Sequence, residues 1–259
     1  MKATATQSTS TTKSKQRLLN CAIYSYWEGP RHWYYDLCHE TVLRHNPQAR
    51  VLTRSDVEKV LGPLPSVLDS MYVTHRVDWI RKAFIHRVGG LWIDMDFVCF
   101  SDLSPIASLG KMFDFVGFKE WGNDAFMDNF FVGKKGSVIL ADAAEYALSQ
   151  AEKNGRNTPW LSMATDAMRF AMEKNPWTHW MQIPTHLVSP VGFAKHHSDW
   201  YSGQDAHHAQ EEIDKFKCFG FMTSKHMLDN WLDQLGSAEA LLMGTSRLGT
   251  LVRKGLGLK

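Results

Sequence analysis

The hydrophobic residues of this chain form short continuous runs that alternate with segments of helical periodicity. Apolar runs bounded by turn residues are typical of buried strands, and they occur at 22–27, 49–53, 91–100, 114–118 and 129–135. Helices are predicted at 32–45, near 55, and at 73–88, 137–153 and 159–174. Such alternation predicts an α/β fold with a mostly parallel sheet, helices on both faces, and a ligand crevice at the carboxyl ends of the strands.

Two helix boundaries are marked by specific residues. Ser55 and Glu58 have the spacing of a capping box, which predicts that a helix begins there. Gly89 and Gly90 follow the predicted helix at 73–88, at the position where a left-handed C-cap is favoured. The apolar stripe of that helix consists of Val73, Val77, Ile80, Phe84 and Val88.

Length and composition predict one folded domain with a variable segment at each end. The chain has 259 residues and is 44% hydrophobic, enough for a substantial core. Residues 1–17 are rich in Ser, Thr and Lys and are predicted to be a disordered leader; a transit peptide would usually carry Arg and an apolar face. Residues 18–240 are predicted to form the single domain. The basic, glycine-rich segment 241–259 is expected to be a frayed tail, with weak membrane-surface contact as the alternative.

Charge and hydropathy exclude several classes of protein. A formal net charge of +2 gives no basic field for a nucleic acid. The apolar runs are too short to cross a bilayer and the sequence starts with no signal-peptide pattern, so a soluble, cytoplasmic protein is expected. The four cysteines lack C-x-x-C spacing and are expected to be reduced core residues. The ten tryptophans would suit sugar stacking, but core or interface positions are simpler for Trp33, Trp160, Trp177, Trp180 and Trp200.

Asp94 and Asp96 interrupt the apolar run at 91–100. On extended backbone their spacing places both carboxylates on one side, where they repel unless a cation lies beside them. Carboxylate oxygens suit Mg²⁺ or Mn²⁺, whose shell is usually completed by water and substrate phosphates. The alternative is a solvated turn between strands with incidental acids.

Asp78 and Arg81 lie three residues apart on the preceding helix and would border the same crevice. Asp78 would accept hydrogen bonds from sugar hydroxyls, and Arg81 would hold a phosphate or a carboxylate. The alternative is an ordinary helix-surface ion pair of Asp78 with Arg81 or Lys82.

The segment THRVDWIRKAFIHRVGGLWIDMDFV resembles the signature of DxD sugar transferases of the capsular-polysaccharide-synthesis and glycosyltransferase family 32 type. The pattern is Asp-x-x-Arg, an apolar helix, Gly-Gly, an apolar pair and Asp-x-Asp. The resemblance implies a GT-A nucleotide-diphospho-sugar fold, a role in polysaccharide biosynthesis, and a UDP-sugar donor held through Mn²⁺ or Mg²⁺. The matching positions are Asp78, Arg81, Gly89, Gly90, Trp92, Asp94 and Asp96.

Weaker matches extend the resemblance over most of residues 20–235. Tyr26 and Trp27 resemble aromatic residues that flank the nucleotide base, and Asn129 resembles an Asn near the donor sugar. His226 and Trp231 have the spacing of a late element that closes over metal and diphosphate. Asn230 stands where that element usually has Ser. Metal ligands are thus expected at Asp94, Asp96 and His226, with donor contacts also at Asn230 and Trp231.

The implied reaction transfers a sugar from a nucleoside diphosphate to a glycan hydroxyl, with a base required only for inversion. Asp128 is the predicted base and Asp124 the second candidate, while Asn129 would suit the β face of the sugar in a retaining enzyme. A haloacid-dehalogenase-type phosphatase is an alternative, because IDMDFV fits its Asp-x-Asp-x-Val motif. A carbohydrate-binding protein without turnover is the non-enzymatic alternative.

The segment 175–215 matches no family element. Its two His-His pairs, 196–197 and 207–208, lack metal-ligand spacing and predict a polar surface loop.

Overall fold

The computed structural model describes residues 22–120, 124–190, 197–203, 211, 214–215 and 217–258. The predicted leader, Cys21, His196, His207 and His208 lie outside this part of the chain, as does the side chain of His197. The described cysteines Cys38, Cys99 and Cys218 are buried, as predicted. Among the described helices, none combines the length and apolar character needed to cross a bilayer.

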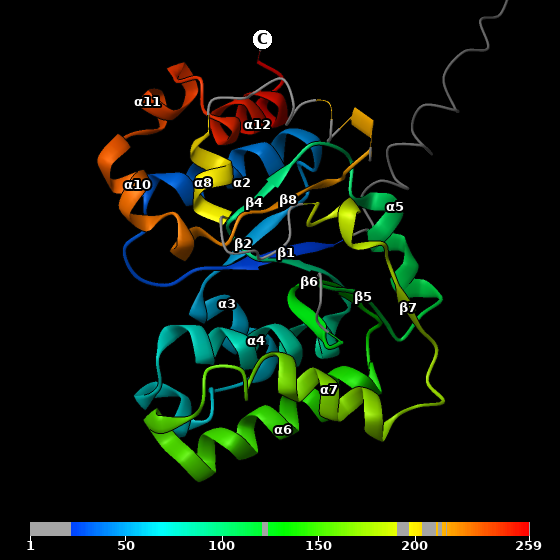
Figure 1. Ribbon diagram of the computed structural model, residues 1–259. Helices are drawn as coiled ribbons and strands as arrows, with labels where there is room; N and C mark the ends of the chain where they lie inside the picture. Colours follow the sequence, from blue (N-terminus) through cyan, green and yellow to red (C-terminus); the bar gives the residue numbers. More distant parts are fainter. Residues whose placement is uncertain are drawn as a thin grey trace, which may run out of the picture.

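A six-stranded sheet in the order β2-β1-β3-β6-β5-β7 forms the centre of the fold (Figure 1). β1 pairs in parallel with β2 and β3, and β5 pairs in parallel with β7. β6 is antiparallel to both β3 and β5, so it is reversed relative to the other five strands. The mostly parallel α/β sheet predicted from the sequence is confirmed. Its strands are β1 (Ile23–Tyr26), β2 (Arg50–Leu52), β3 (Gly90–Ile93), β5 (Phe115–Lys119), β6 (Phe126–Gly133) and β7 (Trp180–Gln182).

The prediction of one continuous strand over 91–100 is wrong. β3 ends at Ile93, and a turn follows in which the Phe97 N–H donates to the Asp94 carbonyl at 3.3 Å. The chain then enters β4 (Phe97–Cys99), which pairs with β8 (Gly220–Met222) in a separate two-stranded sheet. Asp94 and Asp96 therefore lie on a turn, and the argument from extended backbone fails.

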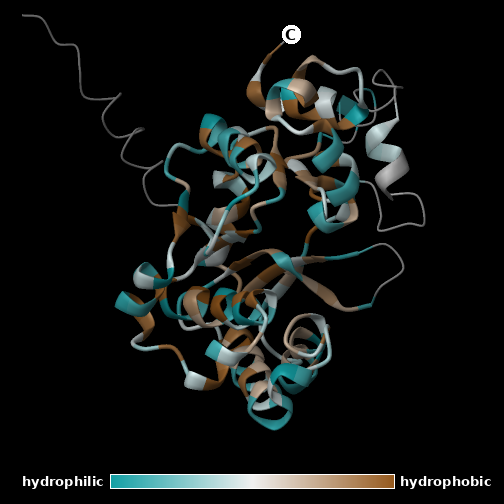
Figure 2. Cartoon of the chain, turned by 90° about the vertical axis from the view of Figure 1, so that its left-hand side faces the viewer, coloured by the Kyte–Doolittle hydropathy of each residue, from teal (hydrophilic) through white to brown (hydrophobic). Residues whose placement is uncertain are grey.

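Four helices cover one face of the sheet, below it in Figure 1. They are α3 (Arg54–Leu61), α4 (Val73–Val88), α6 (Val138–Asn154) and α7 (Thr165–Lys174). Ile80, Phe84 and Ile85 of α4 pack with Trp92 of β3 in one buried cluster. The strands appear in hydrophobic colours in Figure 2 while the helices alternate, as expected for helices with one buried face.

The opposite face is covered by α2 (Trp33–His45), α5 (Ser104–Ala107) and a C-terminal group of helices. That group contains α8 (His197–Ser202), α10 (Asp229–Leu235), α11 (Ala238–Met243) and α12 (Arg247–Leu256). The frayed tail expected for 241–259 is wrong over α12, because Leu248, Leu251 and Val252 are buried in a cluster that includes residues of α2. Membrane contact by this segment stays a prediction.

Helix boundaries depart from the sequence predictions in two places. The capping box of α3 is formed by Thr53 and Asp56, and not by the predicted Ser55 and Glu58. α7 begins at Thr165, because residues 155–164 form a 3₁₀ turn and successive turns. The 3₁₀ segments are η1 (Ser66–Ser70), η2 (Ser108–Lys111), η3 (Gly155–Asn157), η4 (Thr185–Leu187) and η5 (Lys225–Met227).

α4 ends before Gly89 and Gly90 as predicted, and both have positive φ, +76° and +118°. The expected left-handed C-cap is wrong, because Gly89 has an extended ψ of 172°. A Cβ on Gly90 would lie 2.7 Å from the Ala22 carbonyl oxygen, so this residue also permits the close approach of β3 to the chain before β1. The helix therefore turns directly into the strand that carries Asp94.

Candidate functional site

The candidate site lies where β1, β2 and β3 end. These strands are parallel, so their carboxyl ends share one edge of the sheet, where ligands of α/β proteins usually bind. A pocket of about 640 Å³ opens beyond β1 and β2. It is lined by Trp27, Glu28, Gly29, Arg31, Val51, Thr53 and Arg54.

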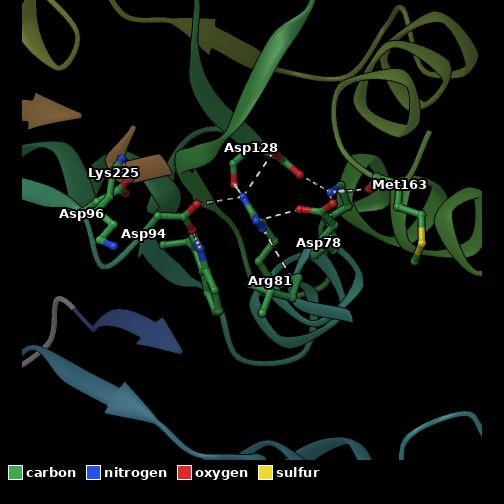
Figure 3. A network of polar contacts seen from close by, with 10 residues as sticks. Asp78, Arg81, Asp94, Asp96, Asp128, Met163 and Lys225 are labelled. Carbon is green, nitrogen blue, oxygen red and sulfur yellow. Dashed lines mark hydrogen bonds and ion pairs between the residues drawn. The ribbon is translucent and has the colours of Figure 1, made fainter. Parts of the chain in front are cut away.

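Arg81 joins three carboxylates at this edge (Figure 3). Its guanidinium donates to Asp78 Oδ1 at 2.7 Å, to Asp94 Oδ2 at 3.3 Å and to Asp128 Oδ1 at 3.2 Å. Burial lowers the pKa of Arg81, but the carboxylates around it outweigh burial and raise it. The Asp78–Arg81 ion pair of the alternative interpretation therefore exists, but it is buried and does not lie on the helix surface.

Lys82 completes a closed ionic cluster beneath Arg81. Its side chain is fully buried and its ammonium donates to Asp128 Oδ2, to the Asp78 carbonyl at 2.9 Å and to the Met163 carbonyl at 2.9 Å. Burial raises the pKa of Asp128, but Arg81 and Lys82 outweigh it and lower the pKa. A buried carboxylate with two cationic partners is a poor proton acceptor, so this geometry speaks against Asp128 as the base.

Asp94 is only partly compensated by its neighbours. Its Oδ1 accepts from the Trp92 indole at 2.8 Å, and its Oδ2 accepts from Arg81. Burial raises its pKa to about 7, against the opposing influence of Arg81, and Asp96 raises it further. Burial also raises the pKa of Asp78 to about 6.

Asp96 is held by a segment that follows β8. Its Oδ2 accepts from the Lys225 N–H at 2.8 Å, and its carbonyl accepts from the Thr223 hydroxyl at 2.6 Å. Burial raises the pKa of Asp96, while the Lys225 amide and the charge of His226 lower it. The Asp94–Asp96 turn is thus an ordered structure, tied to two distant parts of the chain, and the solvated turn of the alternative interpretation does not describe it.

The charges at this edge do not balance. Four carboxylates, on Asp78, Asp94, Asp96 and Asp128, face the two cations Arg81 and Lys82. The raised pKa values of Asp94 and Asp78 show that protons relieve part of this excess. A divalent cation would supply the missing charge instead, and carboxylate oxygens suit Mg²⁺ or Mn²⁺. Within the described ranges, no three His, Cys, Asp or Glu side chains converge as a ready metal cluster. The donor set fits a cation that keeps part of its shell for water and phosphate oxygens.

The two predicted base-stacking residues have different surroundings. Trp27 lines the pocket and its ring lies 4.4 Å from the ring of Tyr35. Tyr26 is buried in the core cluster and donates its hydroxyl to Glu28 at 2.9 Å. Trp27 therefore faces the pocket, whereas Tyr26 is a core residue whose hydroxyl reaches the pocket residue Glu28.

Asn129 and Asp124 also differ. The main-chain carbonyl of Asn129 in β6 accepts from the N–H of Asp94, just after β3, at 2.9 Å. The side-chain Oδ1 of Asn129 is buried and has no partner among the described residues. An unpartnered buried amide oxygen is costly unless a ligand or water satisfies it. Asp124 is exposed at the start of the segment leading into β6, next to residues outside the description.

Of the predicted late element, residues 226–231, the first residue lies near the site. His226 is exposed and its charge acts on Asp96, so it lies near the predicted metal turn. Asn230 is exposed on α10, and Trp231 packs against the core cluster of the C-terminal helices. Direct donor contacts by Asn230 and Trp231 stay predictions.

Sequence analysis missed three residues of the site. Lys82 was considered only as a surface partner of Asp78, yet it is buried. Tyr35 packs against Trp27; burial, followed by the charges of Asp96 and Asp229, raises its pKa. The Lys225 ammonium lies 5.7 Å from the centre of the Tyr35 ring. The sequence signal available for Tyr35 was its position in the first turn of α2, the helix that follows β1.

The phosphatase interpretation places the Asp-x-Asp motif on the first strand of the fold. Here the motif follows β3, and Asp94 is held by Arg81 and by the Trp92 indole. This arrangement does not agree with that alternative.

Comparison with known proteins shows similarity of fold only. No protein-family model matches the chain, and no curated protein matches it. Among solved structures, the PaToxG glycosyltransferase is similar at 10% identity and a TM-score of 0.40, over 95% of this chain and 92% of that one. The apo glycosyltransferase GlyE of Streptococcus pneumoniae TIGR4 is similar at 10% identity and a TM-score of 0.44, over 75% and 51%.

A third structure, a glycosyltransferase involved in glycosylation of the major capsid of PBCV-1, is similar at 14% identity and a TM-score of 0.45, over 83% of this chain and 99% of that one. TM-scores below 0.5 carry no argument about the activity of this chain. Membership of the DxD family therefore stays a prediction.

Proposed function

We propose that this chain is a glycosyltransferase that moves a sugar from a nucleoside diphosphate, with uridine the expected nucleoside, to a hydroxyl group of a glycan acceptor. The observation that carries the proposal is the excess of buried negative charge at the Asp94–Asp96 turn, next to the pocket that Trp27 lines. Carboxylates with raised pKa values in such a place are candidates for a functional site. A bound Mn²⁺ or Mg²⁺ would neutralise the charge of the leaving diphosphate.

The chain's own residues have distinct roles in this proposal. Asp94 and Asp96 hold the metal, and Arg81 orients Asp94 through its guanidinium. Trp27 stacks on the base, and Arg54 and Arg31 at the pocket rim attract the phosphates. Asn129 offers its unpartnered Oδ1 to a hydroxyl of the donor sugar.

Asp128 is a positioning residue in this proposal. It fixes Arg81 and Lys82, and its lowered pKa makes it a poor acceptor of a proton. Of the two predicted bases, exposed Asp124 is the one that an incoming hydroxyl group would be able to reach.

A thermal-shift panel of nucleoside diphosphates and nucleotide sugars tests the proposal, each with Mn²⁺, Mg²⁺ or EDTA. Binding to the native state raises the melting temperature by mass action. We expect a metal-dependent shift with one nucleotide family, lost in Asp96→Asn. Asp166→Asn is the matched control, because Asp166 forms an exposed ion pair on α7.

Turnover is then measured with the nucleotide sugar that gives the largest shift. Release of nucleoside diphosphate above background supports transferase activity. Folded protein that binds no nucleotide under any condition would contradict the proposal. Binding of a nucleotide sugar without release would instead favour the carbohydrate-binding alternative.

A further inference from the structure

An exposed aromatic surface lies beside the ionic cluster. Trp160 is 63% exposed and Tyr72 is 54% exposed, and Leu161 and Val73 extend the same surface. Trp160 is thus not a core residue, and the interface position that was the other expectation stays a prediction. Large exposed aromatic residues that gather at one place mark ligand or partner sites. We call Tyr72, His75 and Trp160 the aromatic platform.

His75 is the unusual member of the aromatic platform. It is 2% exposed, and neither ring nitrogen has a hydrogen-bond partner among the described residues. Its ring centre lies 5.8 Å from that of Trp160 and 6.1 Å from that of Tyr72. Burial lowers its pKa, although the main chain of Trp160 lies near enough to raise it in part. The Trp160 main chain can serve one ring nitrogen at most, and a buried polar atom without a partner calls for a ligand or a water molecule.

The platform is continuous with the proposed reaction site. His75, Asp78 and Lys82 are spaced by three and four residues, so they share one face of α4. Met163, whose carbonyl binds Lys82, is three residues after Trp160. The same helix face and the same loop therefore support both places.

The direction of α4 places the platform beyond the edge of the sheet. α4 precedes β3 and turns directly into it at Gly89 and Gly90, so its first turns lie toward the edge that carries Asp94. His75 is six residues before Arg81, which is about 9 Å along a helix. On its other side this end of α4 reaches the pocket, through the ion pair of Arg76 with Glu28.

We propose that the aromatic platform binds a sugar ring of the acceptor glycan. The inference rests on the proposed function, because an acceptor must lie outward of the donor sugar, which that proposal places at Asn129. The apolar face of a sugar would stack on Trp160, and a sugar hydroxyl would pair with a ring nitrogen of His75. The exposure of Trp160 leaves its indole room to turn and uncover that nitrogen.

Saturation-transfer NMR with a panel of methyl α- and β-hexosides and simple disaccharides tests the proposal on the full chain. We expect transfer to at least one glycoside, and about tenfold weaker binding in Trp160→Ala, as loss of one stacking contact implies. His75→Phe keeps the ring packing but removes both nitrogens, so it should weaken binding while leaving the melting temperature unchanged or higher. Trp177→Ala is the control, because Trp177 is 93% exposed and lies outside the platform.

Several outcomes would overturn the proposal. They are no transfer to any glycoside by the folded wild type, equal transfer in Trp160→Ala, or a concentration-dependent dimer that Trp160→Ala abolishes. The last result would show that a second copy of the chain covers the platform. Nucleotide thermal shifts on the same samples separate this inference from the proposed function, because they depend on Asp96 and not on Trp160.

Discussion

The two halves of the candidate site differ in how their charges are satisfied. In the ionic cluster, Asp128 has a lowered pKa because Arg81 and Lys82 surround it. At the turn, Asp94 and Asp96 have raised pKa values because burial is not fully compensated. The first half is internally neutralised, whereas the second half is the part to which the proposed function assigns a cation.

Breaking the ionic cluster should have the largest effect. Lys82→Met leaves Asp128 with less compensation in a buried position, and the free energy of unfolding should fall by about 3–5 kcal/mol. The double variant Lys82→Met, Asp128→Leu should recover part of this loss, because neither charge then remains unpaired. Urea denaturation of the single and double variants measures both effects. A loss below about 1 kcal/mol in the single variant would show that the ionic cluster contributes little to the stability of the fold.

The stability contribution of the Asp94–Asp96 turn should fall as the pH rises. The folded-state pKa of Asp94 is about 7, above its unfolded value. Its contribution to stability is thus fully present below the unfolded pKa and is lost as pH rises through 7. Asp94→Asn should remove this loss, a change on the order of 1–2 kcal/mol between pH 5 and pH 8. Thermal melts of both proteins across this range in EDTA, followed by melts with Mn²⁺, provide the measurement; identical pH profiles would contradict the assignment.

Removal of one pocket ring should have an intermediate effect on binding alone. Trp27→Ala should weaken nucleotide affinity about tenfold, as expected for one lost stacking contact. Its stability should change little because Trp27 is only partly buried. Calorimetric titration with the nucleotide selected by thermal shift measures the loss. Trp180→Ala, on the edge strand β7, is the control, and equal affinities of both variants would place the base elsewhere.

The smallest effect is expected at His226. The residue is exposed, so His226→Ala should change the free energy of unfolding by no more than about 0.5 kcal/mol. The Mn²⁺-dependent part of the thermal shift should nevertheless decrease, because His226 lies near Asp96. A variant with the same metal response as the wild type would remove His226 from the predicted ligands.

The fold was predictable where a periodic pattern and local turn residues agreed. The stripe of α4 and the Gly-Gly that ends it gave a correct helix and the strand that follows. The reversal of β6 was not predictable, because an apolar run carries no information on strand direction. The break at Asp94 was missed because hydrophobic residues continue on both sides of the turn. α12 was mistaken for a tail because its basic and glycine residues obscured an apolar face.

The site was predictable only as far as residues close in sequence define it. Asp78, Arg81 and Asp94 are joined by contacts that their spacing suggested. The roles of Asp128 and Lys82 depend on a contact across 46 residues, which no local pattern reveals. Spacing alone made Asp128 a base, and its buried ionic partners make it a support.

The hydrogen bonds from Thr223 to the Asp96 carbonyl also have a consequence for the order of folding. They join positions 127 residues apart, and β4 finds its partner only in β8. During synthesis the acidic turn is therefore made long before the strand that fastens it. The nascent chain can form β1, α2 and β2 from local contacts, whereas the ordered geometry of the turn must await the synthesis of β8 and Thr223.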